Sequence, residues 1–302
     1  MKIGILRLSQ RALEKPLYEI DRLVEEGSKR GHEIVTLEEL YFSFGYNGEI
    51  KIFYEGKPFT SCDVIFAKQA ATHEPSLHTV TVETLKKAGF QVVNGMPTFS
   101  VSKNKLASLL RLGEAEIPIP RSIIVRHPSN AKPAAEDIGY PVVIKIAFGT
   151  HGKGVFIAKD PETLQPIADY LNISDRNPII VQEYIAEARQ RDLRVFVIGG
   201  EIAAAMERVA TGEDFRSNAH LGGVGRPVEL TEDEKRIALE ATKAMELDIS
   251  GVDILRSDRG PLVIEVNSNP GYEELEKATG INVALKIIEY LESLGSSPVA
   301  RR

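Results

Sequence analysis

In the first third of the chain, the spacing of apolar residues alternates between the periods of strands and helices. Short apolar runs between polar or glycine residues predict strands, and apolar residues three or four positions apart predict helices. Residues 2–8 (KIGILRL) predict a strand, and residues 16–31 predict a helix that Gly31 ends. Further strands are expected in HEIVTL, KIFYEG, VIFAKQ and FQVVNG, with a helix at 76–88 before the last of them. This alternation indicates a mainly parallel α/β sheet over residues 1–95.

The rest of the chain contains two more groups of elements. A helix is expected at 100–113, after which IPIPR interrupts the pattern. The strands expected beyond it are SIIVRH, PVVIKIAF, VFIAK, PIIVQEYI, DLRVFVI, EIAAAMER, GVDIL and LVIEVN, and the helices are PETLQPIADYL, 231–245 and 281–294. Thr231 and Glu234 have the spacing of a capping box at the start of the second of these helices. The first group, from SIIVRH to PIIVQEYI, predicts a small α+β unit that ends near residue 186.

Composition narrows the class of protein. The chain has 302 residues and no apolar run long enough to span a membrane, and its start reads as a strand and not as a signal peptide. A single cysteine, Cys62, excludes an internal disulfide framework and suits a reducing cytoplasm. With 37 basic and 43 acidic residues, the net charge of −6 argues against nucleic-acid binding by bulk charge. We therefore expect a cytoplasmic protein of two or three domains.

The stretch 251–271 (GVDILRSDRGPLVIEVNSNPG) predicts a hairpin that carries two carboxylates. Because Pro261 cannot donate a ladder hydrogen bond, we place it at the end of a five-residue loop. This register sets Asp253 directly opposite Glu265, with Asn267 on the same face. Facing carboxylates repel each other unless a cation lies between them, and Mg²⁺ prefers such oxygen ligands together with phosphates. The alternatives are a solvent-facing hairpin with tolerated repulsion, or a register slip that turns one carboxylate away.

A glycine-rich segment, AFGTHGKGV, joins two predicted strands. It has neither the Walker A spacing nor the helix that follows a Rossmann fingerprint. Taken alone it is best read as an ordinary turn, although its backbone N–H groups can also cover phosphates. Lys145 strengthens the second interpretation, because it interrupts the apolar strand VVIKIA, where a buried ammonium needs an anion. Lys105, on a predicted helix, is unremarkable alone, and QEYI (182–185) closes an apolar strand whose end can face a base.

Arginines gather in the part of the chain that follows. Arg194 and Arg208 adjoin apolar strands, which favours binding of carboxylate or phosphate oxygens. Arg189 and Arg191 suit surface salt bridges equally well, and Arg216 stands in the segment DFRSN. No triad motif, zinc motif or histidine ligand pattern is present.

In this order, the motifs resemble those of the ATP-grasp superfamily and, within it, the RimK-type α-L-glutamate ligases. The most specific pieces are VIKIAFGTHGKGV, VQEYI, RDLRVFVIGGEIAAAMER, DFRSNAHLGG, SGVDILRSDRGPLVIEVNSNPG and LEKATGIN. The resemblance implies a three-domain ATP-grasp fold of mixed α/β and α+β class. The domains are expected at 1–95, 96–186 and 187–302, with ATP between the second and third.

The resemblance also implies three sets of site residues, carried over position by position. Asp253, Glu265 and Asn267 match the ligands of two Mg²⁺ or Mn²⁺ ions, and Arg194 and Arg208 match catalytic arginines near the acyl phosphate. The matched nucleotide-binding residues are Lys105, Lys145, Gly149, Thr150, Gly152, Gly154, Glu183, Tyr184, Asp192, Arg216, Ser217 and Asn218. The departures from the residues usual in the family are Asn104, Lys153 and Thr211.

The activity that the resemblance implies is a two-step ATP-dependent ligation of L-glutamate. An acceptor carboxylate forms an acyl phosphate with ATP, and the glutamate amine then displaces the phosphate. The acceptor is expected to be a protein C-terminus, as relatives modify a ribosomal protein. The alternatives are a small coenzyme, free polyglutamate, a LysX-like amino-group ligation, or a nucleotide-binding scaffold without turnover. A homotetramer is implied, with no membrane partner and no direct nucleic-acid partner.

Overall fold

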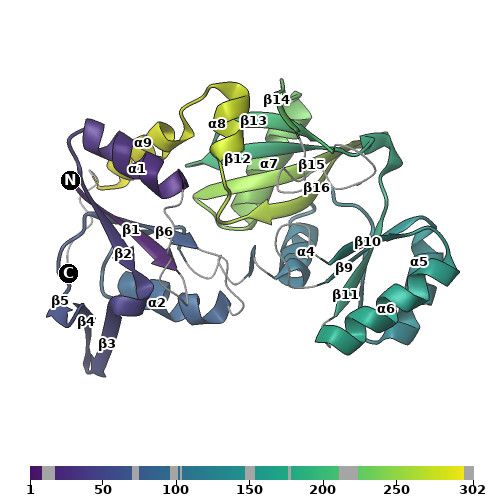
Figure 1. Cartoon of the computed structure of the whole chain (residues 1–302), viewed down its shortest axis with the longest axis horizontal. Coiled ribbons are helices and arrows are strands. Elements are labelled where there is room, and N and C mark those ends of the chain that lie inside the picture. The colour runs from purple at the N-terminus through teal and green to yellow at the C-terminus, as the bar shows by residue number, and fades with distance from the viewer. Residues whose placement is uncertain are drawn as a thin grey trace.

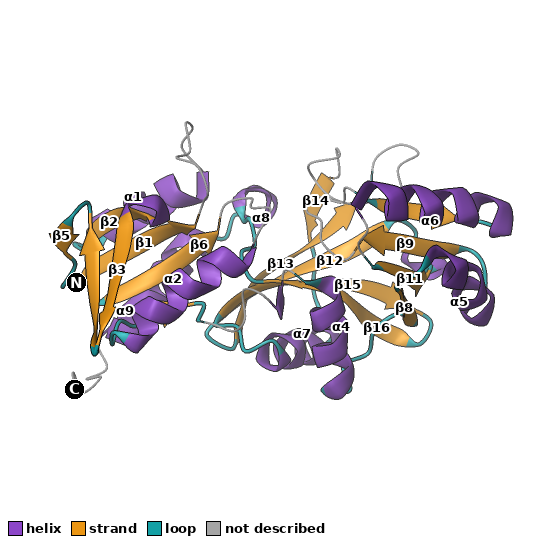
Figure 2. Ribbon diagram, turned by 90° about the horizontal axis from the view of Figure 1, so that it is seen from below, coloured by secondary structure: helices purple, strands orange, loops and turns teal. Residues whose placement is uncertain are grey.

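The structure, a computed structural model of the whole chain, has three larger sheets in a row along its long axis (Figure 1). The N-terminal sheet (residues 2–93) and the central sheet (122–183) lie at opposite ends, and the C-terminal sheet (191–267) lies between them, also when viewed from below (Figure 2). The residues described are 1–8, 18–69, 75–95, 101–102, 104–146, 154–175, 178–210 and 224–295. No helix within these ranges is long and apolar enough to cross a membrane.

The N-terminal sheet is parallel, with the strand order β2-β1-β6-β7. Strand β1 is buried on both faces, which explains its continuous apolar run. After helix α1, Gly31 has a φ of 79°, the left-handed conformation expected of a glycine that ends a helix. The elements are β1 (Lys2–Leu8), α1 (Tyr18–Lys29), β2 (Glu33–Glu38), β6 (Val64–Gln69), α2 (Pro75–Lys87) and β7 (Val92–Val93). The predicted parallel α/β arrangement is confirmed.

One predicted strand lies outside this sheet. KIFYEG contributes β4 (Glu49–Tyr54), which pairs antiparallel with β3 (Phe42–Asn47) and β5 (Lys57–Pro58), after the short helix η1 (Glu39–Tyr41). The Phe42 ring packs against Tyr54 and Phe59, with ring centroids 4.9 and 5.2 Å apart. The pattern does not predict β3, because FSFGYN has no aliphatic residue and its strand depends on these aromatic contacts.

The central sheet is antiparallel, with the order β10-β9-β11-β8. Ala135 of α5 and Leu164 of α6 pack against Val142 and Ile144 of β9, so both helices cover one face of the sheet (Figure 2). The elements are β8 (Ser122–Val125), η2 (Pro128–Asn130), α5 (Ala131–Ile138), β9 (Val142–Ile146), β10 (Val155–Ala158), α6 (Pro161–Asp175) and β11 (Ile179–Glu183). The apolar pattern does not predict α5, since AKPAAEDI is short and contains a proline.

The C-terminal sheet is antiparallel, with the order β14-β13-β12-β15-β16. One face, which includes Val195, Val252 and Val263, packs against α7. The predicted capping box between Thr231 and Glu234 is present at the start of α7. The elements are η3 (Ala186–Ala188), β12 (Arg191–Ile198), β13 (Glu201–Val209), β14 (Val224–Pro227), α7 (Glu232–Ala244), β15 (Ile249–Ser257) and β16 (Gly260–Asn267).

The hairpin of β15 and β16 differs from the prediction at its turn. A tight turn at residues 258–259 joins the strands, and Pro261 lies within β16 opposite Arg256, so the predicted five-residue loop is wrong. Proline is tolerated here because β16 is an edge strand. A bulge after Asp253 takes up one extra residue of β16, so Asp253 still pairs with Glu265.

Helix α4 (Lys105–Glu114) begins later than the helix predicted at 100–113. The Asn104 side chain accepts hydrogen bonds from the backbone nitrogens of Leu106 and Ala107 at 3.0 and 3.3 Å, which makes it the N-cap. Asparagine and aspartate cap helices equally well, so this departure from the usual family residue preserves the helix start.

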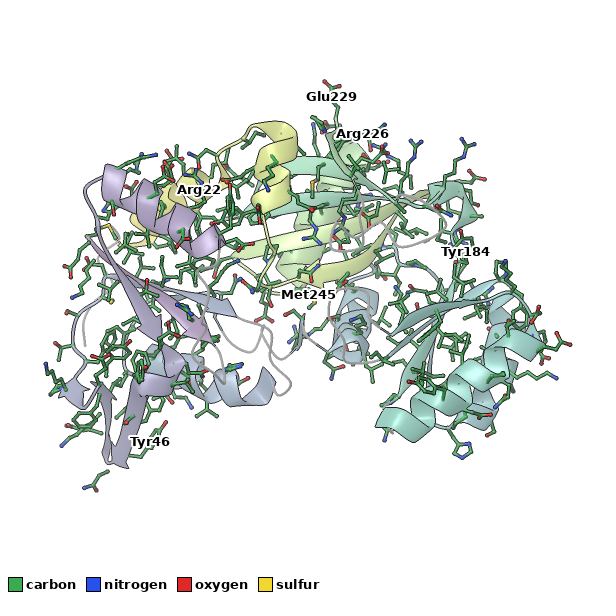
Figure 3. The ribbon with its side chains drawn as sticks, viewed as in Figure 1. Arg22, Tyr46, Tyr184, Arg226, Glu229 and Met245 are labelled. Carbon is green, nitrogen blue, oxygen red and sulfur yellow. The ribbon has the colours of Figure 1, made fainter. Side chains whose placement is uncertain are left out.

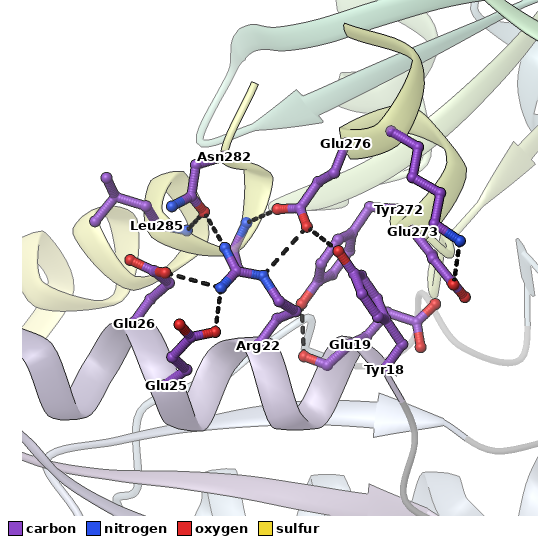
Figure 4. Close-up of polar contacts among 12 residues, drawn as sticks. Tyr18, Glu19, Arg22, Glu25, Glu26, Tyr272, Glu273, Glu276, Asn282 and Leu285 are labelled. Carbon is purple, nitrogen blue, oxygen red and sulfur yellow. Dashed lines mark hydrogen bonds and ion pairs between the residues drawn. The ribbon is translucent and has the colours of Figure 1, made fainter. Parts of the chain in front are cut away.

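The last two helices are α8 (Glu273–Thr279) and α9 (Val283–Gly295). Helix α8 lies against β13 and β14 of the C-terminal sheet, and α9 packs beside α1 against the N-terminal sheet (Figure 1). The sequence pattern predicts α9 but not α8. The Glu276 carboxylate accepts hydrogen bonds from Tyr18 Oη at 2.7 Å, Arg22 Nε at 3.3 Å and the Ala284 nitrogen at 3.0 Å (Figure 4). Glu276 therefore joins α1 to α8 and caps the first turn of α9.

The Glu276→Ala variant is expected to lose about 2 kcal/mol of unfolding free energy, because three donors lose their acceptor and α9 loses its cap. Glu273→Ala, on the same helix, is the matched control. Its carboxylate pairs with Lys277 one turn away, and such exposed pairs contribute only a few tenths of a kcal/mol. Urea unfolding measures both variants, and an equal loss in the two would contradict the role given to Glu276.

Candidate functional site

One face of the C-terminal sheet is charged across adjacent strands. Asp192 and Arg194 lie on β12, and Arg208 of β13 is directly opposite Asp192. On the other side of β12, Arg194 is opposite Asp253 of β15, which is in turn opposite Glu265 of β16. Because strand side chains alternate, these groups share the face that α7 does not cover. The predicted pairing of Asp253 with Glu265 is confirmed.

The arginines on this face neutralise two buried carboxylates. Arg208, which is only 5% exposed, donates from Nε and Nη2 to the two carboxylate oxygens of Asp192 at 2.6 and 2.8 Å. The same Nη2 lies 3.0 Å from Asp253 Oδ2, and Arg194 Nε donates to Asp253 Oδ1 at 2.6 Å. Burial alone would raise the pKa of Asp253, but Arg194 and Arg208 outweigh it and hold that pKa below its ordinary value. Asp253 is therefore ionised.

This network changes the explanation for the facing carboxylates. The sequence hypothesis required a metal ion to offset the repulsion between Asp253 and Glu265, whereas Arg194 and Arg208 already supply positive charge at Asp253. Glu265 and Asn267 are half-buried, and neither side chain makes a hydrogen bond or ion pair with another residue in the described ranges. The assignment of these residues as metal ligands stays a prediction.

Lys145 of β9 brings a charge from the central sheet to the same region. Burial and, to a smaller extent, the charge of Lys105 lower the pKa of Lys145 to about 8, although the carboxylates of Glu265 and Asp253 oppose this change. The structure thus brings the two predicted phosphate lysines within electrostatic range of each other and of the carboxylates. An ammonium whose charge is disfavoured by burial gains from an anionic ligand.

Two residues that the sequence patterns did not single out hold predicted site residues in place. Gln182 accepts a hydrogen bond from Lys145 Nζ at 2.6 Å. Arg259, in the turn of the β15–β16 hairpin, donates two hydrogen bonds to Glu183 at 2.9 and 2.7 Å, and these bonds lower the pKa of Glu183. In the sequence, the position of Gln182 in the apolar strand IIVQE is a weak sign of a functional role. An arginine in a turn, such as Arg259, gives no such sign.

The remaining predicted residues lie near the end of β11, directly before β10, or outside the described ranges. Tyr184 follows β11, at the edge of the central sheet next to the C-terminal sheet (Figure 3). Gly154 has a φ of 79°, and a Cβ there would come within 2.5 Å of Ile146 Cδ1, so only glycine fits. The predicted residues outside the described ranges are Gly149, Thr150, Gly152, Arg216, Ser217 and Asn218, and the departures Lys153 and Thr211 also lie there.

Comparisons of the sequence with a family model and with known proteins agree on one family. Residues 102–291 match the family model of the RimK-like ATP-grasp domain. The chain is 37% identical over 294 residues to the "Probable alpha-L-glutamate ligase" of Marinomonas sp. (strain MWYL1), which covers 97% of this chain and 95% of that protein. It is 38% identical over 300 residues to the protein of the same name from Pseudoalteromonas translucida (strain TAC 125), covering 98% and 97%.

Solved structures share the fold. A RimK domain protein ATP-grasp from Sphaerobacter thermophilus DSM 20745 superposes with a TM-score of 0.69 at 22% identity, covering 96% of this chain and 99% of that one. The ATP-grasp ligase PsnB, solved with its minimal precursor, Mg and ADP, superposes with a TM-score of 0.73 at 16% identity, covering 97% of each chain. On the strength of the family match and the near full-length relatives, the chain belongs to the RimK-like ATP-grasp family and is an ATP-dependent ligase.

Proposed function

We propose that the chain joins the amine of L-glutamate to an acceptor carboxylate through an acyl phosphate formed with ATP. The observation that carries this proposal is the distribution of charge on the C-terminal sheet. Asp253 is already paired with two arginines, whereas Glu265 and Asn267 have side-chain oxygens without a partner in the described part of the chain. The charge of Glu265 is within range of Lys145. The near full-length relatives named as glutamate ligases support the choice of amino acid.

In the proposed complex, ATP lies between the central and C-terminal sheets. Lys105 and Lys145 meet its phosphates, which agrees with the cost of burying the Lys145 ammonium without an anion. The strand end at Glu183 and Tyr184 faces the adenine, and Asp192 contacts the nucleotide. The glycine loop 149–154 and the segment 216–218 complete the nucleotide site in this proposal.

The oxygen donors on this face fit Mg²⁺. This ion takes one or two carboxylates and otherwise binds water and substrate phosphates. Glu265, Asn267 and Asp253 supply two carboxylates and an amide oxygen, although the Asp253 oxygens also bind Arg194 and Arg208. When bound, the ion offsets the charge of the ATP phosphates. A second ion, and Mn²⁺ in place of Mg²⁺, belong to the same proposal.

The protein's own residues contribute by position and charge. In the first step an acceptor carboxylate oxygen attacks the γ-phosphorus, the bond to the bridging oxygen breaks, and ADP leaves. In the second step the neutral glutamate amine attacks the acyl carbon, an amide bond forms, and phosphate leaves as the amine gives up a proton. Arg194 and Arg208, held by buried aspartates, keep fixed positive charge beside the acyl phosphate in both steps.

The acceptor in this proposal is the C-terminal carboxylate of a protein, ribosomal or other. The test incubates the chain with Mg²⁺, ATP, glutamate and one acceptor at a time: a peptide ending in a free carboxylate, a carboxylated coenzyme, or none. ADP release and intact mass are measured. Added glutamyl units on the peptide support the proposal, whereas units on the coenzyme alone, or glutamate polymers without an acceptor, would overturn the assigned acceptor. No acceptor-dependent ADP release with any of them would contradict ligation itself.

Nucleotide affinity is expected to fall as the pH rises above about 8, because Lys145 then loses the charge that attracts phosphates. Bound phosphates raise the Lys145 pKa, so above pH 8 binding takes up a proton and the Kd rises by up to about tenfold per pH unit. Below pH 8 the ammonium is charged with or without nucleotide, and the dependence disappears. Calorimetric titration with Mg–ADP measures the effect. Lys145→Met should bind weakly at every pH, and a wild-type pH profile in that variant would refute the role of Lys145.

A further inference from the structure

A directed chain of hydrogen bonds connects the linker before β8 to Lys145. Ser122 Oγ donates to the Pro120 carbonyl at 2.8 Å, which leaves its oxygen to accept from Gln182 Nε2 at 2.8 Å. Gln182 Oε1 in turn accepts from Lys145 Nζ at 2.6 Å. Because the single hydroxyl hydrogen of Ser122 goes to Pro120 and the Lys145 ammonium can only donate, the direction of every bond in this chain is fixed.

The sheet holds the members of this chain on one face. Gln182 of β11 is directly opposite Ser122 of β8, and Lys145 of β9 is opposite Ile180, two residues before Gln182. Residues two positions apart on a strand share a face, so Lys145 and Gln182 are diagonal neighbours. Gln182 is 3% exposed. If its amide were flipped, Nε2 hydrogens would face the Lys145 ammonium, donor against donor, and Ser122 would have to give up its bond to Pro120 to donate to Gln182.

Gln182 suits this position because its side chain is uncharged. The charged groups that act on Lys145 are Glu265 and Asp253 of the C-terminal sheet and Lys105 of α4. The Gln182 amide adds a hydrogen-bond acceptor without adding a charge, so it orients the ammonium and leaves its positive charge for a phosphate. A carboxylate at the same position would compete with the phosphates for that charge.

We propose that Gln182 is a positioning residue of the ligase: it holds the Lys145 ammonium toward the nucleotide phosphates, and Ser122 sets the orientation of the amide that does so. This inference rests on the proposed nucleotide-binding role of Lys145. Ser122 and Gln182 act on Lys145 only through these hydrogen bonds, and Gln182 itself touches no reacting atom in this proposal.

The test compares Gln182→Met, Gln182→Glu and Ser122→Ala with the wild type and with Lys145→Met. Methionine keeps the length of the side chain and removes the acceptor, and Ser122 still donates to Pro120 in that variant. Glutamate keeps the shape and adds a charge. Each protein is titrated with Mg–AMP-PNP from about pH 7 to about pH 10, a range that spans the lysine titration, and its thermal unfolding is recorded at the same pH values.

In Gln182→Met the Kd is expected to rise about tenfold at neutral pH, because a hydrogen bond to a charged group is lost, and the pH midpoint of binding moves down. In Gln182→Glu the affinity also falls, but the midpoint moves up by about one pH unit because the added carboxylate favours the ammonium. Ser122→Ala should raise the Kd by a smaller factor, since the amide can then turn.

The outcomes separate this inference from the function on which it rests. If Lys145→Met weakens binding while both Gln182 variants keep the wild-type Kd and midpoint, Gln182 has no positioning role and the inference is wrong. If Lys145→Met binds as well as the wild type, the proposed role of Lys145 is wrong. A change in melting temperature of the Gln182 variants without a change in midpoint would assign Gln182 a structural role and would also overturn the inference.

Discussion

Replacing Glu265 by glutamine is expected to reduce ATP-dependent ligation by at least about a hundredfold, since even residues that only support metal ligands cost up to that factor when mutated. The change keeps the shape of the side chain and removes its charge. The Glu265 carboxylate makes no ion pair or hydrogen bond with other residues in the described ranges, so folding has no such contact to lose. The proposed cation, in contrast, loses an anionic oxygen beside the ATP phosphates. Acceptor-dependent ADP release measures the activity, and urea unfolding measures the stability.

Glu240→Gln provides the matched control for this variant. Glu240 lies on α7, the helix that covers the opposite face of the sheet, and its exposed carboxylate pairs with Arg236 at 2.9 Å. We expect ligation at the wild-type rate in this control. Wild-type activity in Glu265→Gln, or a loss of activity that only follows a loss of folded protein, would count against the proposed metal role of Glu265.

Replacing Arg208 by methionine is expected to lower the unfolding free energy by about 3–5 kcal/mol, because removing one member of a buried ion pair leaves uncompensated charge in the interior. Arg208 is buried between Asp192 and Asp253, with nitrogen–oxygen distances of 2.6 to 3.0 Å. Urea unfolding near neutral pH measures the loss. Arg236→Met is the control, since its half-exposed guanidinium pairs with two exposed carboxylates on α7 and should contribute little.

The pH dependence of stability in the Arg208 variant is a second expected result, and its direction can be derived. In the wild type, Asp253 has a lowered pKa, so it contributes stability above its ordinary pKa that is lost as the pH falls through the folded-state value. Without Arg208, only Arg194 opposes the effect of burial, so the pKa of Asp253 rises from its lowered value. The folded variant then binds a proton more readily than the folded wild type, and its deficit relative to the wild type should shrink as the pH falls below about 5, where carboxyl groups begin to be protonated. A deficit that is constant with pH would indicate lost packing and not an uncompensated carboxylate.

The hairpin shows how a sequence argument can reach the right pair of residues by an incomplete route. Placing Pro261 in a loop predicts a turn that is too long, yet the bulge after Asp253 restores the pairing with Glu265. Sequence alternation identifies which residues share a face, but a bulge depends on how the strand fits its neighbours. The same limit explains β3, which depends on aromatic contacts with β4 and Phe59.

The sequence by itself determined the periods of the main strands and helices, the capping box of α7, the family and the alternation that puts Asp253, Glu265 and Asn267 on one face. These features depend on residues close together in the chain or on motifs in a given order. Only the tertiary structure decided which charges meet: Arg194 and Arg208 at Asp253, Gln182 at Lys145, and Arg259 at Glu183. These partners come from different strands or from a hairpin turn, so their contacts depend on strand order, register and the approach of two sheets, which local apolar spacing does not encode.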